Sequence, residues 1–151
     1  MASWKEVEEA EPEFAARVRR LFDAHRHKTI ATLRADGSPR ISGIEAEFAD
    51  GELTFGSMPE SRKGADLLRD PRFALHSASE DPPEGNPSAW TGDAKVAGRA
   101  VLVGELEGEV SGQSFRADLD EVVLTGLNDA GTMLVIESWR SGRGLRRVER
   151  E

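Results

Sequence analysis

The first regular pattern along the chain is a helical one. Between residues 13 and 25, apolar side chains recur at intervals of three and four positions, as they do on one face of an α-helix. These side chains are Phe14, Val18, Leu21 and Phe22. Pro12 stands just before them, at a place where the first turn of a helix tolerates proline. The pattern predicts a helix over residues 13–25 that covers a core with its apolar face.

After this helix the apolar period changes to two, which is typical of strands. Residues 28–57 contain three such segments, and the turn sequences RADGSP and FADGE separate them with Asp-Gly pairs. The alternating positions of the second segment are Ile44, Glu45, Ala46, Glu47 and Phe48. In the third segment Leu53, Phe55 and Ser57 lie on one side of the strand, so Ser57 ends an inward-facing row. The pattern predicts an antiparallel meander of three strands.

The rest of the chain continues this β pattern with one short helix. That helix is predicted over residues 61–69 and ends before Pro71, because the residue before a proline disfavours helical geometry. Strands are predicted over residues 73–79, 93–105, 121–127 and 132–139, a surface loop over residues 80–92, and a short helical turn over residues 111–119. Gly98, inside the long strand, indicates a β-bulge or a close approach of another backbone.

These elements define the expected fold class. About seven mostly antiparallel strands with two covering helices give a mainly β (α+β) protein. An antiparallel sheet of this size is best closed on itself, because closure removes its free edges. We therefore expect a β-barrel.

Composition favours a single soluble domain and narrows its partners. The chain has 151 residues and a formal net charge of -8, and 38% of its residues are hydrophobic. One core is enough for this length, so residues 1–151 are expected to form one domain. The acidic balance gives no reason to expect nucleic acid, and no apolar stretch is long enough to cross a bilayer. The acidic N-terminal sequence differs from a signal peptide, and cysteine is absent, so a cytoplasmic protein without disulfides is expected.

The first turn of the helix at residues 61–69 carries the most informative chemistry. Ser61, Arg62 and Lys63 place a hydroxyl and two cations at the positive end of the helix macrodipole, where cations are unfavourable and an anion is stabilised. A phosphate would suit this turn. The alternative is that Ser61 is only an N-cap and the two cations are solvated. These three residues alone leave both interpretations open.

The other polar candidates are ambiguous. His25, His27 and His76 have no cysteine or carboxylate cluster with them on one face, so a metal site is not expected. Glu45 and Glu47 form the solvated face of a strand or, less simply, a catalytic carboxylate pair. No nucleophile or nucleotide motif is present in the sequence, and no catalytic acid or base can be named.

The C-terminal segment, residues 140–151, follows Trp139 and contains five arginines. It is either a solvated tail or a segment that reaches a ligand or a partner. In the second case Trp139 packs on a planar ligand and an arginine binds an anion. In the first case Trp139 belongs to the core. The sequence supports these two interpretations of the C-terminal segment equally.

The order and spacing of the elements resemble the pyridoxamine 5'-phosphate oxidase-like, FMN-binding split β-barrel superfamily. IATLRADGSPRISGI is similar to the first two strands of that superfamily, and LTFGSMPESRKGADLLRDPRFAL to its third strand, phosphate-binding turn and helix. AKVAGRAVLV is similar to its long strand, and ESWRSGRGLRR to its closing segment. The Ser-Arg-Lys motif with a following Asp-Pro-Arg is the most specific part. The likeness covers most of the chain and implies a split β-barrel.

The resemblance also implies a cofactor site. The residues that it assigns to the cofactor are Ser42, Ile44, Glu45, Ser57, Ser61, Arg62, Lys63, Asp93 and Trp139. Within this set, residues 61–63 would hold the phosphate of FMN, and the backbone around Ile44 and Glu45 would lie at the edge of the ring. Trp139 would cover the ring from the second subunit of a homodimer.

Three positions differ from the oxidases of pyridoxamine phosphate. Those enzymes carry an arginine and a lysine where this chain aligns Ser42 and Glu47, and a glutamine where it has Asp93. Pyridoxamine phosphate is therefore not the expected substrate. The expected function is a flavin-type oxidoreductase that binds FMN noncovalently and transfers a hydride to or from a small organic molecule. The alternatives are a reductase that uses the deazaflavin coenzyme factor 420, a non-catalytic cofactor-binding or sensing module, and a heme protein with a histidine ligand.

Overall fold

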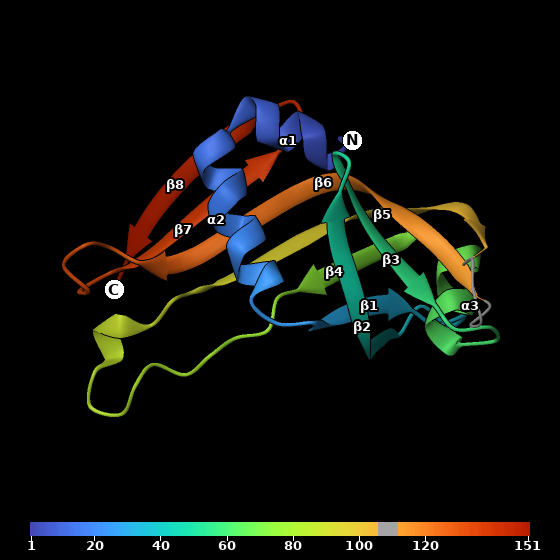
Figure 1. The fold of residues 1–151 in the computed structure, drawn as a ribbon, viewed down its shortest axis with the longest axis horizontal. Helices are drawn as coiled ribbons and strands as arrows, with labels where there is room; N and C mark the ends of the chain where they lie inside the picture. Colours follow the sequence, from blue (N-terminus) through green and yellow to red (C-terminus); the bar gives the residue numbers. More distant parts are fainter. Residues whose placement is uncertain (106–111) are drawn as a thin grey trace.

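A computed structural model describes residues 1–105 and 112–151, which form an eight-stranded sheet and three α-helices (Figure 1). The helices are α1 (Trp4–Ala10), α2 (Pro12–Asp23) and α3 (Arg62–Arg69), with a 3₁₀ turn η1 at Pro87–Ala89. The strands are β1 (His27–Leu33), β2 (Pro39–Ala49), β3 (Glu52–Ser57), β4 (Arg72–His76), β5 (Asp93–Glu105), β6 (Gln113–Leu127), β7 (Leu134–Arg140) and β8 (Gly144–Arg150). No helix within these two ranges is long and apolar enough to span a bilayer.

Six of these strands close into an antiparallel barrel. Their order is β3-β2-β1-β4-β5-β6, and β3 pairs with β6 to complete the ring. Phe55 and Phe115 are paired at this closure, and their rings stack with a centroid distance of 6.0 Å. β7 and β8 continue the sheet outward from β6. The predicted mainly β, mostly antiparallel barrel with covering helices is confirmed.

The hydrophobic core is formed by the side chains that recur with the helical period on α2 and with the period of two on the strands. On β3, Leu53, Phe55 and Ser57 are buried, which confirms the inward row. The helix predicted over residues 13–25 is α2, and its buried stripe includes Phe14 and Val18. α2 packs on β5 and β6 (Figure 1). The apolar face of the helix thus covers the part of the sheet from which β7 and β8 continue.

A further helix, α1, precedes α2 and was not predicted. Its cap is reciprocal, because Ser3 Oγ accepts from the backbone N–H of Glu6 at 3.3 Å and Glu6 Oε2 accepts from the backbone N–H of Ser3 at 2.7 Å. Two of its seven residues, Trp4 and Val7, are buried, which is too few to show a period. Trp4 packs on Phe48 of β2 at 4.6 Å between ring centroids. Tertiary contacts therefore hold this helix more than its own pattern does.

Two expectations for the second half of the chain need correction. The helical turn predicted over residues 111–119 is instead the start of β6, because Phe115, Ala117 and Leu119 are buried with a period of two. Position 111 lies outside the described residues. Residues 140–151 are not a solvated tail, since residues 144–150 form β8 along β7. The sheet therefore has eight strands where about seven were predicted.

Gly98 marks an irregularity in β5, as the sequence predicted. The register of β5 on β6 shifts between Ala97 and Gly98. A Cβ on Gly98 would overlap the carbonyl oxygen of Asp118 on β6. Both the bulge and the close backbone approach are therefore present.

Candidate functional site

The start of α3 lies where the inward row of β3 stops. Ser61 caps the helix, and its Oγ accepts a hydrogen bond from the backbone N–H of Gly64 at 3.1 Å. Ser57 is 3% exposed and donates its hydroxyl to Gln113 Oε1 at 3.0 Å. The turn between the two serines contains Glu60 with a φ of 59°, in the left-handed region that is unfavourable for a residue with a side chain. The backbone therefore turns sharply between β3 and α3.

Gly64 fills the space between these two serines. A Cβ at this position would lie 2.7 Å from Ser57 Oγ and 2.9 Å from Ser61 Oγ. It would also lie 3.2 Å from Gln113 Oε1. The absence of a side chain at Gly64 thus allows the first turn of α3 to reach the end of β3. The first N–H groups of a helix have no acceptor inside it, so such a turn suits an anion.

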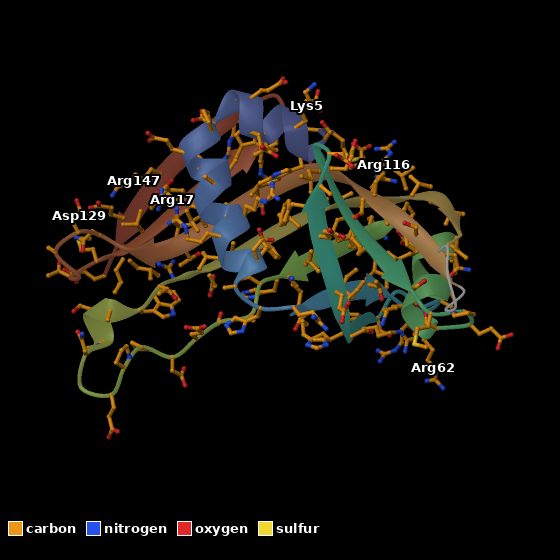
Figure 2. The ribbon with its side chains drawn as sticks, in the orientation of Figure 1. Lys5, Arg17, Arg62, Arg116, Asp129 and Arg147 are labelled. Atoms are coloured by element: carbon orange, nitrogen blue, oxygen red, sulfur yellow. The ribbon has the colours of Figure 1, made fainter. Side chains whose placement is uncertain are left out.

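The two cations of this turn point in different directions. Lys63 reaches back over β2, and its Nζ donates to the carbonyl oxygen of Gly43 at 3.0 Å. Arg62 is exposed, and Figure 2 shows its side chain pointing away from the barrel. The two neighbouring residues are therefore not equivalent, although the sequence treats them as a pair.

A groove of about 890 Å³ runs over β2 and β3 beside the start of α3. Of the residues that the resemblance assigns to a cofactor, four line it together: Ile44, Glu45, Ser57 and Lys63. Residues at the end of α2 and the start of β1, between positions 23 and 28, also line it. The groove thus joins the helix start to a strand surface on which a flat ligand could lie.

The other five assigned residues do not line this groove. They are Ser42, Ser61, Arg62, Asp93 and Trp139. Ser42 is half-buried on β2, and Asp93 begins β5 with its carboxylate 3.8 Å from His76 Nε2. Trp139 is 6% exposed and belongs to the hydrophobic core of its own chain. In the single chain, the core interpretation of Trp139 therefore holds.

Charges of both signs face the groove. The charged residues that line it are Asp23, Arg26, Lys28, Glu45, Glu47 and Lys63. Lys28 is 6% exposed, and this burial lowers the pKa of its amine. The negative charges of Asp23 and Glu45 raise the pKa, but by less than burial lowers it. The groove therefore offers cations from β1 as well as from α3.

Two of the three histidines also line the groove. They are His25 and His27, whereas His76 lies on β4 outside it. His25 Nε2 lies 2.6 Å from a carboxylate oxygen of Glu80, and His27 Nε2 lies 3.7 Å from one of Glu45. Within residues 1–105 and 112–151, no three His, Asp or Glu side chains are grouped closely enough to hold a metal ion.

A buried carboxylate fixes α3 on the barrel. Asp66 is 2% exposed and accepts hydrogen bonds from Thr32 Oγ1 at 2.7 Å, from Arg40 Nε at 2.7 Å and from Arg69 at 2.9 Å. Burial, the largest influence, raises the pKa of this carboxyl, but the three hydrogen bonds outweigh it and the pKa lies below its ordinary value. Asp66 is therefore charged at neutral pH and joins the helix to β1 and β2.

The sequence interpretation missed three residues of this region: Lys28, Asp66 and Gln113. The sequence predicts a helical turn at Gln113. Asp66 carries little local signal, because two of its three partners, Thr32 and Arg40, come from distant strands. Lys28 does have a signal, since it stands two positions before the buried Ile30 and so shares the inward side of β1. A lysine at an inward strand position could have been identified as unusual.

The chain matches a protein family over most of its length. The family model of pyridoxamine 5'-phosphate oxidase matches residues 14–132. A pyridoxine/pyridoxamine 5'-phosphate oxidase from Cupriavidus metallidurans is 53% identical over 49 residues. The matched segment is 31% of this chain and 23% of that protein, so it spans less than a quarter of the relative.

Several solved structures share the fold. PhzG from Burkholderia lata 383, in complex with tetrahydrophenazine-1-carboxylic acid, has a TM-score of 0.67 at 12% identity, covering 100% of this chain and 97% of that one. A pyridoxamine 5'-phosphate oxidase-related, FMN-binding protein from Nostoc punctiforme has a TM-score of 0.63 at 10% identity, covering 100% and 98%. A heme-binding protein from Mycobacterium smegmatis has a TM-score of 0.54 at 13% identity, covering 88% and 86%. These structures show a shared fold, and the family match over residues 14–132 shows that the chain belongs to the pyridoxamine 5'-phosphate oxidase family.

Proposed function

We propose that the groove binds FMN noncovalently and that the chain is an oxidoreductase which transfers a hydride to or from a small organic substrate. The observation that carries this proposal is that Lys63, in the first turn of α3, lines the groove together with Ser57. A cation, a hydroxyl and helix N–H groups in one place are a common arrangement for phosphate. Family membership supports the choice of cofactor, because a protein of the same fold is named as FMN-binding.

The residues present fit FMN in size and in donors. A volume of about 890 Å³ is within the range of pockets that hold ligands of this size. The ammonium group of Lys63 has three donors, and Gly43 takes one of them, so two are left for phosphate oxygens. Lys63 and the first turn of α3 would therefore hold the phosphate. The backbone of β2 around Ile44 and Glu45 would lie along the ring.

The protein's own part in the reaction is binding and shielding. When bound, FMN supplies the redox chemistry by accepting or donating a hydride. Ile44, Ala46 and Phe55 contribute apolar surface to the groove. Apolar surroundings strengthen the charge-assisted hydrogen bonds of Lys63, because water competes less for its donors.

A matched pair of variants tests this site. Lys63→Met removes the α3 cation that lines the groove, and Arg62→Met removes the neighbouring cation, which points into solvent. In a fluorescence titration with FMN, we expect Lys63→Met to weaken binding roughly tenfold or more, because a charge-assisted hydrogen bond is worth about 1.5–3 kcal/mol. We expect Arg62→Met to weaken it about threefold or less, because exposed charges contribute about 0–1 kcal/mol. Equal losses, or no saturable binding by the wild type, would contradict the proposal.

A homodimer is part of the proposal. The resemblance implies that Trp139 covers the ring from a second subunit. The other assigned residues that do not line the groove, Ser42, Ser61, Arg62 and Asp93, also stay proposals. In one chain Trp139 is 6% exposed, so it could contribute only the exposed edge of its indole to a partner's groove.

The deazaflavin coenzyme factor 420 is the alternative within the same class. It also presents a phosphate and a tricyclic ring, so the same groove and the same Lys63 would serve it. The titration is therefore repeated with this coenzyme. Saturable binding of the deazaflavin without binding of FMN would change the cofactor and keep the class of reaction.

A non-catalytic cofactor-binding or sensing module is the alternative from another class. Its support is that Ser42, Glu47 and Asp93 stand where the oxidases carry other groups. A flavin-loaded protein that bleaches with a reductant and recovers its colour with an electron acceptor is an enzyme. Tight binding without such turnover identifies a module.

Heme is a second candidate ligand because His25 and His27 line the groove. A protein of the same fold is named as heme-binding. Both histidines face carboxylates, which would compete with iron for the ring nitrogens. Addition of hemin tests this candidate, since a ligated heme gives a Soret band that His25→Ala or His27→Ala would shift.

A further inference from the structure

Lys28 is a buried cation without an ion pair among the described residues. It is 6% exposed, and Nζ donates a hydrogen bond to the main-chain oxygen of Arg26 at 3.1 Å. An ammonium group has three donors, so two are left. The carboxylates of Asp23 and Glu45 act on it through longer-range attraction, and no hydrogen bond joins either of them to Nζ in residues 1–105 and 112–151.

The position of Lys28 connects it to the groove. Lys28 pairs with Ile44 across β1 and β2, and both residues line the groove. Paired residues project from the same side of a sheet and lie next to each other. Lys28 therefore stands beside the strand position along which the cofactor ring is proposed to lie. Lys63 reaches the same groove from α3.

A ligand explains this arrangement better than packing does. A buried charge without a close partner is unfavourable, and a lysine at a protein surface ordinarily extends its ammonium group into water. Lys28 does not do so. Its burial lowers the pKa of the amine, which is the sign of a charge short of compensation. An anionic group in the groove would supply the missing acceptor.

We infer that Lys28 binds an anionic group of the ligand on the β1 side of the groove, so that Lys28 and Lys63 hold two separate negative groups. The group at Lys28 is either the polar edge of the cofactor ring, which becomes anionic on reduction, or a carboxylate of the substrate. Both present the same chemistry, an anionic acceptor beside Ile44. The assignment to cofactor or substrate rests on the proposed function, whereas the anion site at Lys28 does not.

Two lysine variants and two probes test this inference. Lys28→Met keeps most of the length of the side chain and removes the charge, and removing an unpaired buried charge does not threaten the fold. Lys95→Met is the matched control, because Lys95 is an exposed strand lysine on β5 that does not line the groove. Riboflavin lacks the phosphate and is titrated in its reduced form, in which the ring is anionic, so it reports on the ring. Benzoate, added to the FMN-loaded protein, reports on a substrate carboxylate.

We expect Lys28→Met to weaken the binding of either reduced riboflavin or benzoate by at least roughly tenfold, because one charge-assisted hydrogen bond is lost. We expect Lys95→Met to change the affinity for either probe by less than about twofold. A loss for riboflavin assigns Lys28 to the cofactor, and a loss for benzoate assigns it to the substrate. If Lys28→Met binds both probes as the wild type does, Lys28 is a structural lysine and the inference is wrong.

A further measurement separates this inference from the proposed function. If the wild type binds no flavin, the proposed function fails, and benzoate is then titrated into the cofactor-free protein. The chain has four lysines, so their ammonium signals in nitrogen-15 NMR can be assigned from single variants. A saturable shift of the Lys28 signal supports the anion site. A Lys28 signal that does not move contradicts it.

Discussion

At the scale of single residues, Asp66 shows how one side chain positions the site. Donors from β1, β2 and α3 converge on its carboxylate, so its loss leaves Arg40 with a charge that is 18% exposed and unpaired. We expect Asp66→Asn to lower the free energy of unfolding by about 3 kcal/mol, as breaking a buried ion pair does, in urea titration. Asp70→Asn is the control, because its partner Arg72 is exposed. Equal unfolding midpoints for Asp66→Asn and Asp70→Asn would contradict this role.

The same carboxylate makes stability depend on pH. Its pKa is below the ordinary value in the folded chain and returns to about 3.9 in the unfolded chain. As the pH falls, the unfolded chain therefore takes up the proton first, and the stability that Asp66 contributes at neutral pH is lost. We expect the urea midpoint of the wild type to fall more steeply than that of Asp66→Asn between about pH 5 and pH 3. If the midpoints of the two proteins fall in parallel with pH, Asp66 has no part in the pH dependence of stability.

At the scale of the elements, the bulge in β5 depends on one glycine. A Cβ on Gly98 would overlap the Asp118 carbonyl oxygen, which belongs to a strand backbone and cannot move aside easily. We expect Gly98→Ala to lower the free energy of unfolding by roughly 1–3 kcal/mol, the usual cost of overpacking. The control is Gly126→Ala on β6, where a Cβ would meet nothing within 4 Å. Both variants are compared by thermal unfolding, in which Gly126→Ala should keep or slightly raise the midpoint temperature. A similar fall of the midpoint in both variants would show that the Asp118 contact does not matter.

The elements that could be predicted are those whose own residues carry the period. α2 has an apolar stripe, β3 has an inward row that ends in Ser57, and β5 has the bounds that its sequence indicates. α1 and β8 carry no such period. They form because α1 contacts distant strands and β8 pairs with β7. These contacts cannot be identified from a local pattern.

The same limit applies to the candidate site. The start of α3 is local in sequence, and the sequence predicted a helix that begins at the Ser-Arg-Lys motif. The groove depends on strand register, which places Lys28 beside Ile44 and brings Gln113 to Ser57 across 56 positions of chain. That Lys63 lines the groove and Arg62 points into solvent is also a consequence of the fold rather than of the motif.

At the scale of the whole molecule, one outward row of the barrel suits a second copy. The register places Ile41, Ala31, Ala74 and Ala97 side by side on β2, β1, β4 and β5. Ile41 is 74% exposed, and its neighbours in the row are small and apolar. Such a surface can pack closely against a flat partner.

We therefore expect the chain, of 16.5 kDa, to sediment at about twice its mass in analytical ultracentrifugation. Ile41→Asp should shift the protein towards the monomer, because it would bury a charge in the interface. Leu68→Asp is the control, since Leu68 is 54% exposed on α3, away from this row. A monomeric wild type, or a dimer that Ile41→Asp leaves intact, would contradict this surface as the interface.

The position of β8 has a further consequence for how the molecule behaves at high concentration. Within residues 1–105 and 112–151, the six strands of the barrel leave no free edge, but β8 ends the sheet and offers its outer backbone groups to any other strand. Its sequence, GLRRVER, places three arginines along that edge, and one of them, Arg147, is paired with Glu149 at 2.8 Å, so the edge keeps a net positive charge. Two such edges repel each other, so fibre-like growth of the sheet from one molecule to the next is opposed. We therefore expect this segment, whose composition looks like that of a solvated tail, to oppose aggregation.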